Sequence, residues 1–378
     1  MPDPTASMVV IEAVVFHPKA GPYDQPMLEV LARTLFEGTD TYPRDELRRL
    51  SLGSGGPLRC STMPDALRIE IGVSPDRLAK GLAVLRSLLT EPLLPDAVVE
   101  RVKAELPFAN RSPWAEAQQP EVLNFGLVRQ PDLARFSRRL FRSNHLSVAV
   151  SGPFRPNEAR DAWMRATSDW QDDPVDFSTP EAANLPEQKR HSKAVTTIEL
   201  RGTEFSAADT TVPAKVLAAF ALGVGKQSAV FRVLRERLRL SYRQEAFLWP
   251  TAGGFVPRVV FAVKPSEREG DLGAKAADAL RKDVASWTET DRQRAFAMAE
   301  AVFERGLDLN PMHLSLLGPQ ANSQDGRTFL AAYWPVKMGS PWNERRFMAS
   351  LRAVSLETMR SEADASLATA KVYTISGL

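Results

Sequence analysis

Arg235 and Tyr242 are the two side chains of this sequence whose type and position best suit hydrogen-bond chemistry on a bound molecule. A guanidinium group and a phenol group both donate hydrogen bonds. The two residues lie in the stretch 228–242, where a helical pattern ends and a strand pattern begins. The alternative interpretation is that Arg235 is one of several solvated arginines and that Tyr242 is a core aromatic residue with a hydrated hydroxyl group.

The first part of this stretch has the pattern of an amphipathic helix. Its apolar residues recur at helical spacing, and arginines fill positions between them. The apolar residues are Val230, Phe231, Leu234 and Leu238, and the arginines are Arg232, Arg235, Arg237 and Arg239. From residue 240 the pattern alternates with a period of two, as a half-buried strand requires. We therefore expect Arg235 on a helix and Tyr242 at the start of a strand at 240–248.

The stretch resembles the C-terminal-domain motif of the pitrilysin/insulinase-type zinc metallopeptidases, the inverzincins, whose relatives include the mitochondrial processing peptidase. The matching residues are Leu-Arg-Glu at 234–236 and Leu-Ser-Tyr at 240–242. The resemblance extends over nearly the whole chain. It implies that Arg235 and Tyr242 bind the backbone of a substrate peptide and help to stabilise the tetrahedral intermediate.

The zinc-binding motif of that family is degenerate in this chain. In catalytic members, a helix ahead of a Phe-x-Gly-Thr sequence carries His-x-x-Glu-His, whose imidazoles bind zinc and whose glutamate is the base. Aligned on Phe-Glu-Gly-Thr at 36–39, the three positions fall on Glu29, Ala32 and Arg33. Ala32 offers no base, and Arg33 places a permanent cation where a neutral ligand belongs. We expect no metal in this chain.

Glu29 and Arg33 are four residues apart on an expected helix at 27–36, so we expect an ion pair between them. Such a pair contributes about 0.3–0.5 kcal/mol when it is exposed. The family's third zinc ligand, a glutamate on a later helix, falls near Asn110, with Glu105 the nearest acidic residue. The four histidines are too dispersed to suggest a metal site; they are His17, His145, His191 and His313.

Length and composition are those of a globular protein with two domains. The chain has 378 residues, of which 44% are hydrophobic and 25% charged, and domains average about 150 residues. A net charge of only +2 gives no reason to expect nucleic acid or an anionic membrane as partner. The single cysteine, Cys60, excludes an internal disulfide. No apolar run approaches the roughly 20 residues that span a bilayer. The cytoplasm is the expected compartment, with the periplasm as the alternative if an export signal is missing from the sequence.

Hydrophobic patterns predict a duplicated unit. Strands are expected at 8–16, 58–62, 67–73, 144–152, 194–200, 240–248, 255–263 and 372–377, and helices at 27–36, 76–90, 95–106, 212–222, 271–287 and 290–307. A segment at 172–193, rich in Pro and charged residues, reads as a linker. We therefore predict an α+β fold of two homologous domains, 1–178 and 190–378. Each should contain a mostly antiparallel mixed sheet with helices packed on one face.

Two other binding functions fit the sequence poorly. The glycine-containing loop at 223–228 lacks the spacing and the final Gly-Lys-Ser/Thr of a phosphate-binding loop. The arginines at 232–243 lack the interleaved aromatic residues of a nucleic-acid surface, and helix and strand geometry points them in different directions.

The resemblance implies a non-catalytic subunit of a heterodimeric zinc metallopeptidase that cleaves unfolded or precursor peptides. Its partner would be a homologous zinc-binding subunit, and Arg235 and Tyr242 would complete that partner's active site. The alternative is a catalytically inert scaffold or peptide-binding protein of the same fold. A third interpretation, a peptidase active alone with a displaced metal site, lacks a visible ligand set.

Overall fold

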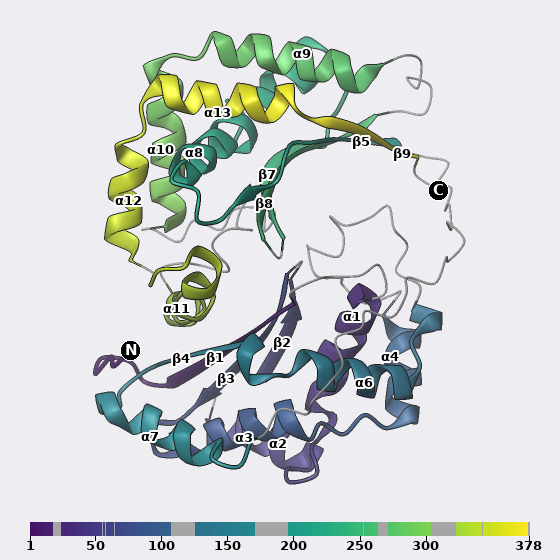
Figure 1. The fold of residues 1–378 in the computed structure, drawn as a ribbon, viewed down its shortest axis with the longest axis vertical. Coiled ribbons are helices and arrows are strands. Elements are labelled where there is room, and N and C mark those ends of the chain that lie inside the picture. The colour runs from purple at the N-terminus through teal and green to yellow at the C-terminus, as the bar shows by residue number, and fades with distance from the viewer. Residues whose placement is uncertain are drawn as a thin grey trace. The chain divides into compact units, whose positions relative to one another are not determined.

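The computed structural model describes residues 1–17, 24–54, 56, 58–63, 65–106, 125–170, 196–251, 253–263, 271–303, 323–341 and 343–376. The chain divides into two compact units, each with its own sheet and helices (Figure 1). The first unit comprises Met1–Ala117, Leu123–Pro186 and Gln324–Val336, and the second comprises Gln118–Val122, Glu187–Ser323 and Lys337–Leu378. We expected all residues after 190 to belong to the second domain. The segment Gln324–Val336 instead belongs to the first unit. The expected linker itself lies outside the described residues.

The first unit contains a four-stranded antiparallel sheet in the order β2-β3-β1-β4. The strands are β1 (Val9–Phe16), β2 (Leu58–Thr62), β3 (Ala66–Val73) and β4 (Leu146–Ser151). Ile11 on β1 lies opposite Ile71 on β3 and Val150 on β4, so β1 is a central strand. All four strands, including the β2–β3 hairpin, confirm the sequence prediction.

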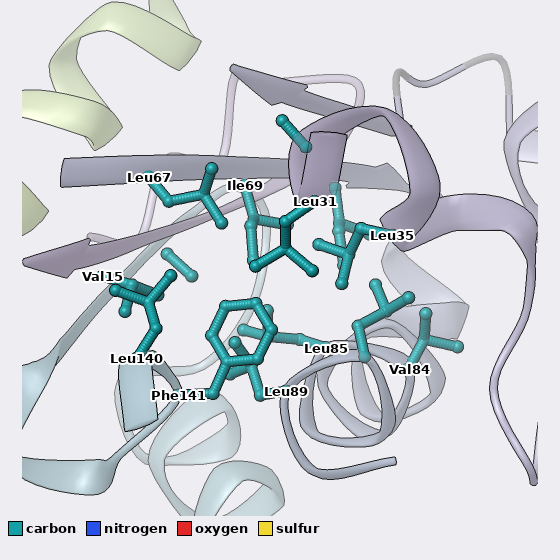
Figure 2. Packing of buried hydrophobic residues seen from close by; sticks show 14 of the residues in the cluster. Val15, Leu31, Leu35, Leu67, Ile69, Val84, Leu85, Leu89, Leu140 and Phe141 are labelled. Carbon is teal, nitrogen blue, oxygen red and sulfur yellow. The ribbon is translucent and has the colours of Figure 1, made fainter. Parts of the chain in front are cut away.

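Helices cover one face of this sheet and form the core of the unit. In sequence order the unit's helices are α1 (Asp24–Thr34), α2 (Arg44–Ser54), α3 (Leu78–Thr90), α4 (Asp96–Glu105), α6 (Gln130–Leu140) and α7 (Pro156–Ala166). The unit also contains α11 (Gln324–Met338) as far as Val336. Figure 2 shows Val15 and Ile69 of the sheet packed with Leu31 of α1 and Leu85 of α3. Every second residue of β1 from Val9 to Val15 belongs to this core, as the period-two geometry of a strand requires.

The opposite face of the first sheet is covered by α11. The ring of Tyr333 stacks on that of Phe16, with centroids 5.5 Å apart. The Arg68 guanidinium lies 5.1 Å from the centroid of the Phe329 ring. Both faces of β1 and β3 are therefore buried. The sequence analysis expected helices on one face only, and it did not predict α11, which covers the other face.

The second unit repeats the strand order of the first. Its five-stranded sheet runs β6-β8-β5-β9, and β7 also pairs with β8. The strands are β5 (Thr196–Arg201), β6 (Phe205–Ser206), β7 (Gln244–Pro250), β8 (Gly254–Val263) and β9 (Lys371–Ser376). The helices are α8 (Val212–Gly223), a π-helix (Phe231–Arg237), α9 (Leu272–Ala285), α10 (Glu289–Phe303), α12 (Glu344–Arg352) and α13 (Leu356–Ala368). The central β8-β5-β9 order matches β3-β1-β4, which confirms the predicted duplication. Among the described residues, no helix has the length and apolar character needed to cross a membrane.

Candidate functional site

Arg235 lies on a π-helix instead of a regular α-helix. The amide of Leu238 donates to the carbonyl of Val233 at 2.8 Å, and the amide of Leu240 donates to the carbonyl of Leu234 at 2.8 Å. These hydrogen bonds span five and six residues, so the helix widens toward its C-terminal end. The wider turn holds Arg235 at the exposed surface of the second unit. Hydrophobic periodicity predicted a helix here but could not distinguish this type.

Tyr242 lies in a bend before β7, and its predicted place at the start of a strand is wrong. The strand begins at Gln244, four residues after the expected position 240. Ser241 explains the shift, because its hydroxyl donates to the carbonyl of Arg243 at 2.6 Å and accepts from the amide of Ala262 on β8 at 3.1 Å. The backbone of Arg239 adopts a φ of 55°, a left-handed conformation that turns the chain. The Tyr242 side chain is consequently 79% exposed, which also excludes the alternative that it is a core residue.

The structure brings Arg235 and Tyr242 together. The Arg235 guanidinium lies 5.3 Å from the centroid of the Tyr242 ring and 4.9 Å from that of Phe231. These distances are within the range of cation–π attraction. Both side chains are exposed, so their N–H and O–H groups are accessible to a bound molecule from one surface. The two residues chosen from the sequence therefore form a single potential donor site.

A buried carboxylate on α9 holds the π-helix in place. Asp283, with a side chain 3% exposed, accepts from Arg232 at 2.6 Å and from the indole N–H of Trp287 at 3.1 Å. Arg237 reaches its other oxygen at 3.5 Å. Arg232 and Arg237 thus point toward α9, and they do not join Arg235 in a continuous basic surface. The sequence analysis missed Asp283, although its spacing of four residues from Trp287 within the helix expected at 271–287 was a usable signal.

Comparisons with known proteins identify the fold. No protein-family model matches the sequence, and no curated protein matches it. A solved structure of a "peptidase M16 inactive domain" from Pseudomonas fluorescens matches with a TM-score of 0.71 and 12% identity, covering 100% of this chain and 94% of that chain. The fold is that of M16 domains. A protease from Helicobacter pylori matches with a TM-score of 0.75 and 13% identity, over 98% of this chain and 94% of that one. A conserved protein from Enterococcus faecalis V583 matches with a TM-score of 0.69 and 13% identity, over 100% and 95% of the two chains. The M16 fold agrees with the resemblance read from the sequence.

The zinc that the family resemblance of the sequence implies for catalytic members does not fit the residues on α1. Glu29 is 5% exposed and accepts a hydrogen bond from the hydroxyl of Thr62 on β2. Ala32 is a buried apolar residue, and Arg33 is an exposed cation. A single carboxylate beside an alanine and an arginine does not provide the neutral and anionic donors that zinc requires. The predicted Glu29–Arg33 ion pair stays a prediction.

Among the other candidate ligands, those that the structure describes do not form a metal site. Glu105 is paired with Arg101 at 3.3 Å on α4, and Asn110 lies outside the described residues. His17 is buried, His145 contacts the carbonyl of Leu140 at 3.2 Å, and the remaining two histidines lie outside the described part of the chain. Within that part, no cluster of three or more His, Cys, Asp or Glu residues could hold a metal ion.

Proposed function

We propose that this chain is the non-catalytic subunit of a heterodimeric zinc metallopeptidase that cleaves unfolded peptides or precursor peptides. Its partner in this proposal is a homologous chain with an intact His-x-x-Glu-His motif, which holds the zinc and the base. The proposal depends chiefly on one observation, the exposed pairing of Arg235 with Tyr242 at 5.3 Å. The degenerate positions Glu29, Ala32 and Arg33 support it, because they remove zinc chemistry from this chain.

Arg235 and Tyr242 are suited to complete the active site of that partner. Arg235 would donate hydrogen bonds to a backbone carbonyl of the substrate, and Tyr242 would donate its phenol O–H to the developing oxyanion. The π-helix hydrogen bonds and the Ser241 contacts fix both backbones before substrate arrives. Donors that are fixed in advance stabilise a developing charge without reorganisation, and loss of one typically slows the reaction about 10²- to 10³-fold.

Mixing the subunits tests the proposal. Cleavage of a quenched, unstructured peptide is measured with this chain alone, with its zinc-motif homologue alone and with the mixture, and the zinc content of each is quantified. We expect activity only in the mixture and zinc only in the homologue. A mixture no more active than the homologue alone, from chains that do not associate, would overturn the proposal.

Substitutions in this chain then separate its contribution from that of the partner. Arg235→Ala and Tyr242→Phe should each slow the mixture by about 10²- to 10³-fold while the partner's zinc content stays constant. Arg48→Ala, at an exposed arginine of α2 in the first unit, is the control and should keep full activity. Unimpaired turnover in both site variants would show that Arg235 and Tyr242 take no part in the reaction.

A catalytically inert scaffold or peptide-binding protein is the second candidate. The similarity to the Pseudomonas fluorescens structure, which is described as a peptidase M16 inactive domain, favours it. The stacking of Arg235 on two aromatic rings would then be a local surface contact. A stable homodimer without a zinc-binding partner, and peptide binding without cleavage, would support this function over the first.

A further inference from the structure

A cavity of about 310 Å³ lies in the second unit between the sheet and the helices α8 and α13. Its sheet side is formed by apolar residues that include Leu200 of β5, Leu248 of β7 and Val259 of β8. Leu222 of α8 and Leu367 of α13 line it from the helix layer. Protein interiors normally leave few voids larger than a water molecule. A space of this size beside the core therefore has the dimensions of a ligand site.

Small side chains create this cavity. Ala218 and Ala219 on α8, Ala246 on β7 and Ala365 on α13 all line it. Alanine side chains end at Cβ, so these lining positions leave more space open than longer apolar residues would. The cavity is partly open, since Ala365 and Thr369 of its lining are exposed to solvent. A small molecule can therefore reach it without unfolding of the unit.

The lysine and one glutamate that line the cavity, Lys215 and Glu362, pair with each other. The Lys215 ammonium lies 2.5 Å from both the Glu362 carboxylate and the Thr211 hydroxyl, and 3.6 Å from the carboxylate of Asp209. The ammonium therefore donates two hydrogen bonds and has a second carboxylate nearby. A charged ligand would have to break the Lys215–Glu362 pair and bury an unpaired charge, which is costly.

The second lining cation is also held by neighbours. The Arg258 guanidinium lies 4.4 Å from the centroid of the Trp249 ring, and its Nε is 3.3 Å from a carboxylate oxygen of Glu199. Burial lowers the pKa of Arg258 to about 10, and the carboxylate of Glu199 opposes that change. Arg258 is thus paired with Glu199 and lies against an aromatic ring, although its buried Nε makes no hydrogen bond. An anionic ligand placed beside Arg258 would also lie close to the carboxylate of Glu199, which would repel it.

The size of the cavity sets the size of its ligand. An apolar cavity of about 150 Å³ is known to accommodate benzene, which has six carbon atoms. A cavity of about 310 Å³ is twice as large, so it accommodates on the order of twelve carbon atoms. Removing that much apolar surface from water supplies the driving force for binding.

We propose that this cavity binds an uncharged, apolar small molecule of about twelve carbon atoms. The site is distinct from Arg235 and Tyr242, neither of which lines it. The proposal does not depend on the peptidase role, because it follows from the lining of one unit alone. Its ligand class is an alkyl chain or fused aromatic molecule without a formal charge.

Methyl NMR of the full chain tests this site. The chain is titrated with decan-1-ol, and with decanoate and decylammonium as charged counterparts of equal length. We expect saturable shifts of the Ala218, Leu222 and Leu248 methyl groups with decan-1-ol and weaker binding of both charged probes. Methyl groups of the first core, such as Leu31 and Leu85, should not shift.

A cavity-filling variant with a matched control completes the test. Ala219→Leu combined with Ala365→Leu should weaken decan-1-ol binding by at least about tenfold, because excluding two methylene groups already has that effect. Ala221→Leu combined with Ala368→Leu makes the same changes on the same helices outside the cavity lining and should leave the affinity unchanged. If the filled variant does not fold, the single exposed substitution Ala365→Leu replaces it, against Ala368→Leu.

Three results would overturn the proposal. The first is the absence of saturable shifts at the cavity with all three probes. The second is equal affinity in the filled and control variants, which would place binding elsewhere. The third, tighter binding of decanoate or decylammonium than of decan-1-ol, would overturn the uncharged ligand class.

Discussion

The phenol of Tyr333 donates a hydrogen bond of 2.8 Å to Oδ2 of Asp65, a residue 268 positions earlier in the sequence. Tyr333 lies on α11, and Asp65 lies in the turn between β2 and β3. Both side chains are buried, and burial together with the neighbouring Asp65 charge raises the pKa of Tyr333 well above its usual value. The phenol therefore stays protonated and remains a donor. This hydrogen bond helps to hold the segment Gln324–Val336 against the first unit.

Tyr333→Phe should reduce the free energy of unfolding by about 1–3 kcal/mol, because it removes the phenol donor from a buried carboxylate. Urea denaturation followed by circular dichroism measures the change. Tyr242→Phe makes the same chemical change at an exposed side chain and should alter stability by less than about 0.5 kcal/mol. Equal losses in the two variants would show that the Tyr333–Asp65 hydrogen bond has no special role.

A buried carboxylate on the same sheet face makes stability depend on pH. Glu12 on β1 is fully buried and accepts a 2.9 Å hydrogen bond from Nε of Arg68 on β3. Burial raises the pKa of Glu12 from 4.5 to about 7, and Glu70 and Asp325 add to the rise, whereas Arg68 opposes it. Between pH 4.5 and about pH 7, Glu12 is therefore protonated in the folded state and ionised in the unfolded state.

Glu12 should therefore lower stability as the pH rises from 4.5 to about 7. Stability falls with pH wherever the folded state binds more protons, and the pKa difference corresponds to a loss of up to about 3 kcal/mol. Glu12→Gln should flatten this dependence, since the amide does not titrate. Urea denaturation at about pH 5 and about pH 8 gives the two slopes. An identical pH slope in the variant would contradict the assignment to Glu12.

The sequence predicted the elements whose patterns are local. The strands β1, β2, β3 and β8 lie within one or two residues of their expected bounds, because short runs of apolar and β-branched residues between turn residues mark strands locally. The position of α11 could not be predicted in this way. Its contacts depend on pairings such as Arg68 with Phe329, which join distant parts of the chain and leave no periodic signal.

The candidate site shows the same limit. The choice of Arg235 and Tyr242 came from residue type and family resemblance, and in the structure the two side chains lie next to each other. The bend that exposes Tyr242 depends on the hydrogen bond between Ser241 and Ala262 of β8. A period-two pattern continues through such a bend without interruption, so the sequence placed Tyr242 in a strand that begins only at Gln244.

Asp283→Asn should destabilise the second unit by about 1–3 kcal/mol, because it removes the charge of a buried hydrogen-bond acceptor from Arg232 and from the largely exposed Arg237. Arg232 keeps a second anionic partner in Asp291. Asp278→Asn on the same helix is the matched control, since Asp278 is 62% exposed and pairs with Lys282 at 2.7 Å. The control should lose less than about 1 kcal/mol. Urea denaturation monitored by Trp fluorescence measures both. A small and equal effect of the two substitutions would show that Asp283 does not anchor the π-helix.

The stacking of Arg235 on Tyr242 can be separated from the chemistry of the phenol. Tyr242→Phe keeps the ring and therefore the cation–π contact, whereas Tyr242→Ala removes it. A double-mutant cycle with Arg235→Ala should give a coupling energy of about 0.5–1 kcal/mol for Tyr242→Ala, as expected for an exposed cation–π pair. The coupling for Tyr242→Phe should be close to zero. Urea denaturation of the chain alone supplies these values.

In the assembled peptidase, the effects of Tyr242→Phe and Tyr242→Ala on kcat should rank differently from their coupling energies in the chain alone. If the phenol O–H stabilises the oxyanion, Tyr242→Phe alone should lower kcat by about 10²- to 10³-fold despite its intact ring. Tyr242→Ala should then be at least as impaired, because it also loses the ring on which Arg235 stacks. If the ring alone matters, by orienting Arg235, Tyr242→Phe should keep full kcat while Tyr242→Ala does not. Full kcat in Tyr242→Phe with reduced kcat in Tyr242→Ala would assign Tyr242 a positioning role and leave Arg235 as the donor to substrate.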